Sequence, residues 1–492
     1  MRAIRGDGAK EIALELSETL RTAARPLLKG RQAAILWFVA VFFVTFVVYR
    51  LTDGPKTAFN GPVLLADALL HGRLDIVNGK DLLHLDWAVY QGKYYVVEPA
   101  TTALVVLPGV LLYGTALNQT LVSTVIGALN ASVVFRLMRG LTDKLSLQVG
   151  LTVLFAFGTT YWWNANDGGI WYFSSATAVL FMFLAIHETL VSKRPFLAGL
   201  FLGAAYFSRL PTILALPFFV IMFSDQWLRW DTSRPLLQRL NWRPLFELGA
   251  GLAVFLGISF VYNYLRFDTP LPASYHYWME YHKEGVPAGV LVKGLFDATY
   301  IPRHIPTAFE MLPVFQSQPP YVVPSWAGMA IWATTPAFLY ALFAGIRGSL
   351  VRAGWLAAIV AAIAVAFLSA RGIEVMDAPS WNLIAWPFAA LILFGIATNL
   401  NNRLVLACWA AILPIALTHF TVALTGWPQF GYRFALDYYP FLLLLTMLGM
   451  GDKLKWYHVA LIGASVVISA AGVVWIHEFD PVQKFGYRWV TW

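Results

Sequence analysis

The sequence predicts an all-α polytopic membrane protein, and two observations lead to this fold class. Of the 492 residues, 59% are hydrophobic and only 13% are charged, with a mean hydropathy of +0.63. A soluble domain carries about 25% charged residues. The apolar runs are continuous and lack the alternation of outer-membrane strands, so helices are the expected spanning elements. Length and charge bias together predict about 13 transmembrane helices.

The positive charges orient the chain in the membrane. Residues 1–32 are rich in Arg and Lys, which predicts a cytoplasmic N-terminal segment. The transmembrane domain then covers 33–476, with outer loops at 51–116 and 268–325, and the tail 477–492 lies outside. We therefore expect a multi-pass protein of a bacterial plasma (inner) membrane, with its N-terminus cytoplasmic and its C-terminus outside.

The apolar runs can be followed in order along the chain. After the first span at 33–49, the run 102–113 contains Pro108 and is too short to cross, so we expect a juxtamembrane or re-entrant helix within the first outer loop. The run 195–224 is split by Ser208-Arg209-Leu210-Pro211, which predicts a hairpin of two short helices with Arg209 at its outer tip. The other predicted crossings are 117–137, 147–163, 172–190, 245–267, 326–346, 353–370, 381–398, 404–423, 435–449 and 458–476.

The first outer loop concentrates acidic residues. Six carboxylates lie between residues 51 and 101, namely Asp53, Asp67, Asp75, Asp81, Asp86 and Glu98. Ionisable residues inside the predicted spans are few, which argues against an ion-coupled transporter. The net charge of +8 is explained by the inner loops, so nucleic acid is not an expected partner. The histidines lack metal-ligand spacing, and no metal or other cofactor is predicted.

Carboxylates, arginines and aromatic residues on one face suit transfer of a sugar from a lipid phosphate. A carboxylate accepts a proton from an attacking hydroxyl, and a guanidinium holds a phosphate and stabilises its charge as a leaving group. Aromatic faces suit sugar rings or lipid tails. These residue types predict glycosyl transfer from a donor that lies in the bilayer with its head group outside.

Several short motifs of the chain resemble those of a known protein family. They are Asp53 directly after the first span, LLADALLHGRLD at 64–75, Asp86-Trp87-Ala88, Gly92-Lys93-Tyr94-Tyr95, the glycine-containing run before Ser208-Arg209-Leu210-Pro211, and Tyr432-Arg433-Phe434 leading to Pro440. This arrangement covers nearly the whole chain. It resembles the GT-C superfamily of membrane glycosyltransferases, in the branch of protein mannosyltransferases and lipid A aminoarabinose transferases.

The resemblance implies inverting transfer from a polyprenyl-phosphate sugar to a hydroxyl of a glycan, lipid or protein acceptor. It implies a catalytic acid just after the first span, which makes Asp53 the first candidate and Asp86 the second. The family often has an acidic pair there, whereas Gly54 follows Asp53 here. Arg209, Arg433 and Lys93 are the candidate phosphate-binding residues. The candidate substrate-lining residues are Tyr94, Tyr95, Asp167, Trp171, Tyr432 and Asp437.

Structural interpretations stand beside each of these assignments. In these interpretations, Asp53 pairs with Arg50 or caps the first span, Asp86 fixes a turn, and Lys93 reaches toward the membrane interface. Arg209 would form a buried salt bridge with a carboxylate, and Arg433 would pair with Asp437 at the i, i+4 spacing. The alternative functions are a non-enzymatic exporter of lipid or polysaccharide and a catalytically inactive GT-C relative.

Overall fold

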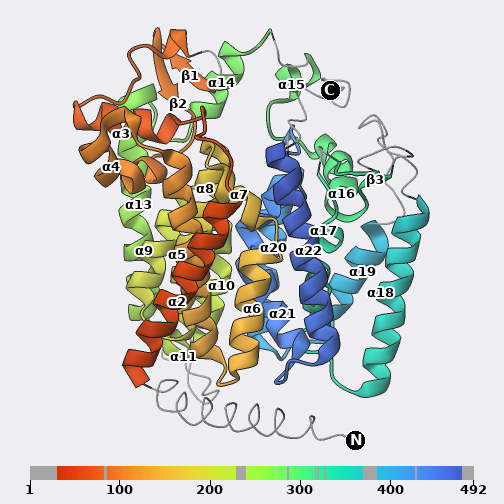
Figure 1. Cartoon of the computed structure of the whole chain (residues 1–492). Coiled ribbons are helices and arrows are strands. Elements are labelled where there is room, and N and C mark those ends of the chain that lie inside the picture. Colours follow the sequence, from red (N-terminus) through yellow and green to blue (C-terminus); the bar gives the residue numbers. More distant parts are fainter. Residues whose placement is uncertain are drawn as a thin grey trace, which may run out of the picture.

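The computed structural model describes residues 30–82, 86–228, 240–284, 288–315, 317, 321–325, 328–369, 385–426 and 429–478. Its helices stand side by side as a bundle, and short helices and hairpins gather at one end (Figure 1). The predicted N-terminal segment and C-terminal tail lie almost entirely outside the described residues. The chain is therefore an all-α protein across its described core, as the composition predicts.

Within the described ranges, six helices are long and apolar enough to cross a membrane. They are α2 (Gly30–Leu51), α5 (Gln119–Leu141), α8 (Ile170–Leu190), α13 (Arg243–Phe267), α20 (Arg403–Phe420) and α22 (Trp456–Glu478). A seventh crossing is possible if α6 (Leu145–Phe157) and α7 (Tyr161–Asp167), which meet at a 52° bend, count as one span. The predicted count of about 13 is not confirmed.

The difference arises because several apolar runs fold as short or broken helices. Proline starts many of these pieces, and it cannot donate the backbone hydrogen bond that continues a helix. The pieces are α9 (Pro195–Tyr206), η3 (Leu210–Ala215), α10 (Leu216–Met222), α11 (Ser224–Trp227), α17 (Ile331–Thr334), η5 (Pro336–Phe343), η6 (Arg433–Tyr438) and α21 (Tyr439–Met450). The predicted break at Arg209 is present, with one short helix ending before it and another beginning after it.

The core of the bundle lies around α5 and α8. The most apolar stretches of α5 and α8 are 72% and 83% buried, whereas that of α2, which lies on the periphery, is 11% buried. Aromatic rings fill the space between these helices, with Phe155 packed against both Tyr161 and Phe183 at centroid distances of 4.7 and 4.9 Å. The remaining long helices of the second half are α18 (Ser349–Ser369) and α19 (Ala385–Ala397).

The two predicted outer loops fold at the same end of the bundle (Figure 1). The first contains α3 (Gly61–Leu70), η1 (Gly79–Asp81), β1 (Trp87–Tyr90), β2 (Lys93–Val96), α4 (Thr101–Tyr113) and η2 (Gly114–Ala116). The second contains α14 (Ser274–Tyr281), α15 (Ala288–Lys293), η4 (Ala298–Tyr300), α16 (Ile301–Phe309), β3 (Val314–Phe315) and β4 (Val322–Val323). The short helix predicted at 102–113 is α4.

A β-hairpin joins these two segments. Strands β1 and β2 are antiparallel, and Gln91 and Gly92 at the turn have positive φ values of 50° and 75°, which suit a two-residue turn. Tyr95 packs edge-on against Phe267, at the end of α13. The hydroxyl of Tyr90 donates a hydrogen bond to Asp268 at 3.0 Å. The hairpin thus anchors the first segment to the start of the second.

Glycines allow α9 and α13 to pack closely. A Cβ atom added at Gly199 would overlap the carbonyl oxygen of Leu248, and one added at Gly251 would overlap the carbonyl oxygen of Phe196. Small residues of this kind let helix backbones approach in membrane proteins. Gly249, on the same helix as Gly251, has open space around it.

We predict opposite effects for alanine at these two positions of α13. Gly251→Ala should lower the melting temperature of the detergent-solubilised protein, because overpacking costs about 1–3 kcal/mol. Gly249→Ala should leave it unchanged or raise it, since alanine is favoured over glycine in a helix by up to about 1 kcal/mol. Equal melting temperatures for the two variants would contradict the close packing of α9 and α13.

Candidate functional site

Charged and polar side chains from distant parts of the chain meet near the end of the bundle that carries the two outer segments. We name this group the polar cluster, and it consists of Asp86, Glu98, Arg209, Tyr275, His419, Arg433 and Asp437. Tyr275 lies in α14, and Glu98, Arg209, Asp86 and Arg433 all act on its hydroxyl electrostatically. One ring thus lies within electrostatic reach of four ionisable residues. The residue is 38% exposed, so the cluster is accessible at this point.

The buried carboxylate of Asp437 is held by two cationic or polar partners. Arg209 donates from Nε to Oδ1 at 3.2 Å and from Nη2 to Oδ2 at 3.1 Å. His419, at the end of α20, donates from Nε2 to Oδ2 at 2.8 Å. The Asp437 side chain is fully buried, whereas that of Arg209 is 14% exposed. Asp437 therefore pairs with Arg209, and the i, i+4 pairing with Arg433 considered above is not formed.

Local sequence explains the position of Arg209. Residues 195–206 form α9, and the following Pro211 lies in the first turn of η3, with Arg209 in an extended conformation between them. An extended residue at a break directs its side chain away from either helix axis. The break therefore brings a guanidinium to the carboxylate of a residue 228 positions later in the chain.

Arg433 is buried but keeps one unused donor. Its Nε donates to the carbonyl oxygen of Gly426 at 2.7 Å, and its backbone N–H donates to the side chain of Gln429 at 2.8 Å. The guanidinium lies over the ring of Tyr172 at 5.1 Å. Within the described residues, Nη1 is buried without a hydrogen-bond partner. A fixed, buried cation with an unused donor can bind an anionic oxygen.

Glu98 is the least expected member of the cluster. It is 4% exposed, and its Oε2 is buried with no hydrogen-bond partner in the described part of the chain. The pKa of Glu98 is raised from 4.5 to about 8, mainly by burial and then by the charge of Asp86, while the charges of Arg209 and Arg433 act in the opposite direction. At neutral pH this carboxyl group therefore holds its proton and is a hydrogen-bond donor.

Asp86 connects the two outer segments. Its Oδ2 accepts a hydrogen bond from the indole N–H of Trp171, in the first turn of α8, at 3.0 Å. Its Oδ1 accepts from the indole N–H of Trp278, in α14, at 3.1 Å. Both oxygens act as acceptors, which suits an ionised carboxylate. Asp86 and Trp171, which were both predicted as site residues, are in direct contact.

Two other predicted residues lie beside Arg433. Asp167 ends α7, and its Oδ1 accepts from the backbone N–H of Gly169 at 2.9 Å. The charges of Asp167 and Arg433 interact. Tyr432 is fully buried, and its hydroxyl donates to Nδ1 of His304 at 2.8 Å, while Nε2 of His304 donates to the carbonyl oxygen of Val422 at 2.7 Å. Burial lowers the pKa of His304 to about 3, which fits this neutral tautomer.

Four predicted site residues make no hydrogen bond, ion pair or ring contact with the polar cluster among the described residues. Asp53 forms an ion pair with Arg50 at the end of α2, as the structural interpretation anticipated. Lys93 is exposed at the hairpin turn. Tyr94 packs edge-on against Trp87 and Tyr281, and Tyr95 against Phe267, so both rings stabilise the hairpin.

Sequence reasoning did not select Glu98, His419, Trp278 or Tyr275 for the site. Glu98 did carry a signal, because it is the one charged residue between Lys93 and Arg136. The other three lacked a local signal, since histidine and aromatic residues are common throughout 268–325 and at helix ends. No group of three or more His, Cys, Asp or Glu in the described ranges is arranged to hold a metal ion.

Comparisons with known proteins give no relative for this chain. No protein family matches it, and no curated sequence or solved structure is significantly similar to it. The fold and the site define the class as a helical protein with several helices able to span a membrane and a buried polar cluster near one end.

We predict that Asp437→Asn strongly destabilises the fold. The substitution leaves Arg209 without its counter-charge, and breaking a buried ion pair costs about 3–5 kcal/mol. The melting temperature in detergent measures the effect. The matched control is Glu247→Gln, because the pair of Glu247 with the 83% exposed Arg243 lies at the surface and is worth about 0–1 kcal/mol. Equal losses in the two variants would contradict the prediction.

We predict a pH-dependent stability difference between the wild type and Glu98→Gln. From about pH 5 to pH 8 the unfolded chain has lost the Glu98 proton while the folded chain keeps it, so wild-type stability falls as pH rises. Glutamine cannot titrate, and the difference should therefore grow in favour of Glu98→Gln by at most about 1.4 kcal/mol per pH unit.

Above about pH 8, where the folded chain also loses this proton, the difference should level off. Melting temperatures at pH 5, 6, 7, 8 and 9 measure it, with the exposed Asp81→Asn as control. A difference that stays constant across this range would rule out the raised pKa.

Proposed function

We propose that this protein is an integral-membrane glycosyltransferase. It moves a sugar from a polyprenyl-phosphate donor to an acceptor hydroxyl on the outer face of the membrane, with inversion at the anomeric carbon. The observation that carries the proposal is the gathering of two arginines and three acidic residues near one end of a helical bundle. This arrangement offers both a phosphate site and a proton acceptor.

Arg433 and Arg209 are the proposed contacts of the donor phosphate. Arg433 has an unused Nη1, and Arg209 is partly exposed while Asp437 fixes its guanidinium. In the reaction, the bond between the anomeric carbon and the phosphate oxygen breaks, and the phosphate gains negative charge. Preorganised cations stabilise this charge without moving. The protonated Glu98 would donate a further hydrogen bond to the phosphate.

Asp86 is the better placed of the two proposed bases. Its carboxylate is a neighbour of Glu98 within the polar cluster, whereas Asp53 is paired with Arg50 at the end of α2. The acceptor hydroxyl would attack the anomeric carbon and pass its proton to Asp86. The two tryptophan N–H groups hold the carboxylate in position, and their rings offer flat surfaces for sugar.

The exporter alternative needs a passage from one side of the membrane to the other. The helices α6 and α8 instead pack through buried aromatic rings, including Phe155 of α6 and Phe173 and Phe183 of α8. A polar cluster near one end and packed rings beyond it favour an enzyme that receives its donor sideways from the bilayer.

We predict that Arg433→Gln weakens binding of farnesyl phosphate, a soluble prenyl phosphate that stands for the departing group. A hydrogen bond to a charged group is worth about 1.5–3 kcal/mol, so the dissociation constant should rise by roughly 10- to 100-fold. Calorimetry with detergent-solubilised protein measures it. The control is Lys80→Gln, which removes an exposed positive charge from the first outer segment. Unchanged binding in Arg433→Gln would remove the proposed phosphate site.

We predict that Asp86→Asn lowers the rate of sugar transfer by at least about 100-fold, because a positioned base contributes about 10²–10⁴ to the rate. Asp53→Asn should keep most of the activity. Proteoliposomes supplied with farnesyl-phosphate hexoses and pentoses and a bacterial envelope extract as acceptor provide the assay, with released farnesyl phosphate as the readout. Wild-type activity in both variants would refute a base in the first outer loop.

A further inference from the structure

A pocket lies at the opposite end of the bundle from the polar cluster. Its volume is about 600 Å³, and it is lined by α2, α5 and the region where α8 ends. The helix α8 places the two sites far apart, because Trp171 at its start binds Asp86 and His187 lies 16 residues later. At about 1.5 Å per residue, the separation along the helix is about 24 Å.

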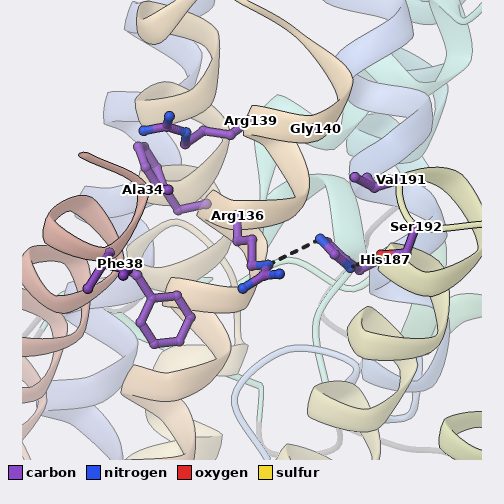
Figure 2. A pocket seen from close by; sticks show the side chains of 10 residues that line it. Ala34, Phe38, Arg136, Arg139, Gly140, His187, Val191 and Ser192 are labelled. Carbon is purple, nitrogen blue, oxygen red and sulfur yellow. Dashed lines mark hydrogen bonds between the residues drawn. The ribbon is translucent and has the colours of Figure 1, made fainter. Parts of the chain in front are cut away.

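One wall of this pocket is apolar and another is basic. Ile35 and Phe38 of α2 and Phe135 of α5 form the apolar wall, and Arg136 and Arg139 of α5 form the basic one. Figure 2 shows Phe38, Arg136 and Arg139 at this pocket. Ile35 is 56% exposed on the peripheral helix α2, so the pocket opens toward the surroundings of the bundle. The apolar wall suits the apolar tail of a ligand, and the basic wall suits an anionic head group on the same molecule.

Arg136 is held in place by a chain of polar contacts. Its Nε donates to Nε2 of His187 at 3.3 Å (Figure 2). The opposite nitrogen, Nδ1 of His187, donates to Glu188 at 3.2 Å, and Glu188 also accepts from Nε of Arg194 at 2.5 Å. Among the described residues, Arg136 forms a hydrogen bond through Nε alone, so its two terminal nitrogen atoms are available to a ligand.

The two arginines have no counter-charge among the described residues. In the described parts of the chain, neither Arg136 nor Arg139 has a carboxylate within ion-pair distance, and Glu188 is already paired with Arg194. The arginines are spaced i, i+3 on α5, where like charges lie next to each other and repel. An anion bound between them would remove this repulsion.

We propose that this pocket binds the phosphate head group of an anionic membrane phospholipid. Its place supports a lipid, because α5 and α8 end here and the exposed Lys144 and Arg194 continue the positive charge. Basic pockets between transmembrane helices at the ends of a bundle bind anionic head groups. The acyl chains would lie along the exposed face of α2. The proposal is independent of sugar transfer.

The test measures lipid binding to the full-length protein in detergent. Dioleoyl phosphatidylglycerol, dioleoyl phosphatidylcholine and inorganic phosphate are added separately, and native mass spectrometry and melting temperature are the readouts. We expect the wild type to prefer phosphatidylglycerol over phosphatidylcholine by roughly tenfold or more, and to melt at a higher temperature with it. Arg136→Gln combined with Arg139→Gln should abolish this preference.

A matched control removes the same charge from the same end of the bundle without touching the pocket. Lys453→Gln combined with Lys455→Gln changes two exposed residues that do not line it, and it should keep the preference. Arg139→Gln alone keeps the contact between Arg136 and His187, and it should weaken the preference even if the double arginine variant misfolds.

Three results would overturn the proposal. One is equal binding of the two lipids by the wild type, and another is a preference that survives both arginine substitutions. The third is stabilisation by inorganic phosphate that depends on these arginines, which would make the pocket a site for soluble anions.

Discussion

The hydrogen-bonded ion pair of Asp437 with Arg209 and His419 ties together three distant parts of the chain. Arg209 lies at the break after α9, His419 ends α20, and Asp437 lies in η6. A fully buried carboxylate is tolerated only when its charge is compensated, so these three segments must meet for the fold to be stable. The positions of Arg433, Glu98 and Asp86 depend on this meeting point.

The polar cluster contains acidic groups in two different states. Asp437 is compensated by Arg209 and His419, and Asp86 accepts two indole hydrogen bonds. Glu98 has neither kind of support at Oε2, and its pKa is raised. Neighbouring carboxyl groups with separate environments can serve separate roles in one site. Here Asp437 and Arg209 form a structural pair, Asp86 is a hydrogen-bond acceptor and Glu98 is a donor.

The sequence predicted the class of the fold, and several of the predicted site residues lie close together. Continuous apolar runs sufficed for α2, α5, α8, α13, α20 and α22, and the Ser208-Arg209-Leu210-Pro211 break was placed correctly. The number of crossings was not predictable, because prolines and glycines divide runs that have enough apolar residues to span. Asp86, Trp171, Arg209, Arg433 and Asp437 do lie in or beside the polar cluster. The partnership of Arg209 with a residue 228 positions away has no local signature.

The two indole hydrogen bonds to Asp86 have a thermodynamic consequence. Trp171 belongs to α8 in the bundle, and Trp278 belongs to α14 in the second outer segment. A ligand that donates a hydrogen bond to Asp86 would compete with one of these indoles and so change how firmly α14 is held to the bundle. By linkage, anything that binds α14 and shifts it would then change the affinity at Asp86 by the same factor.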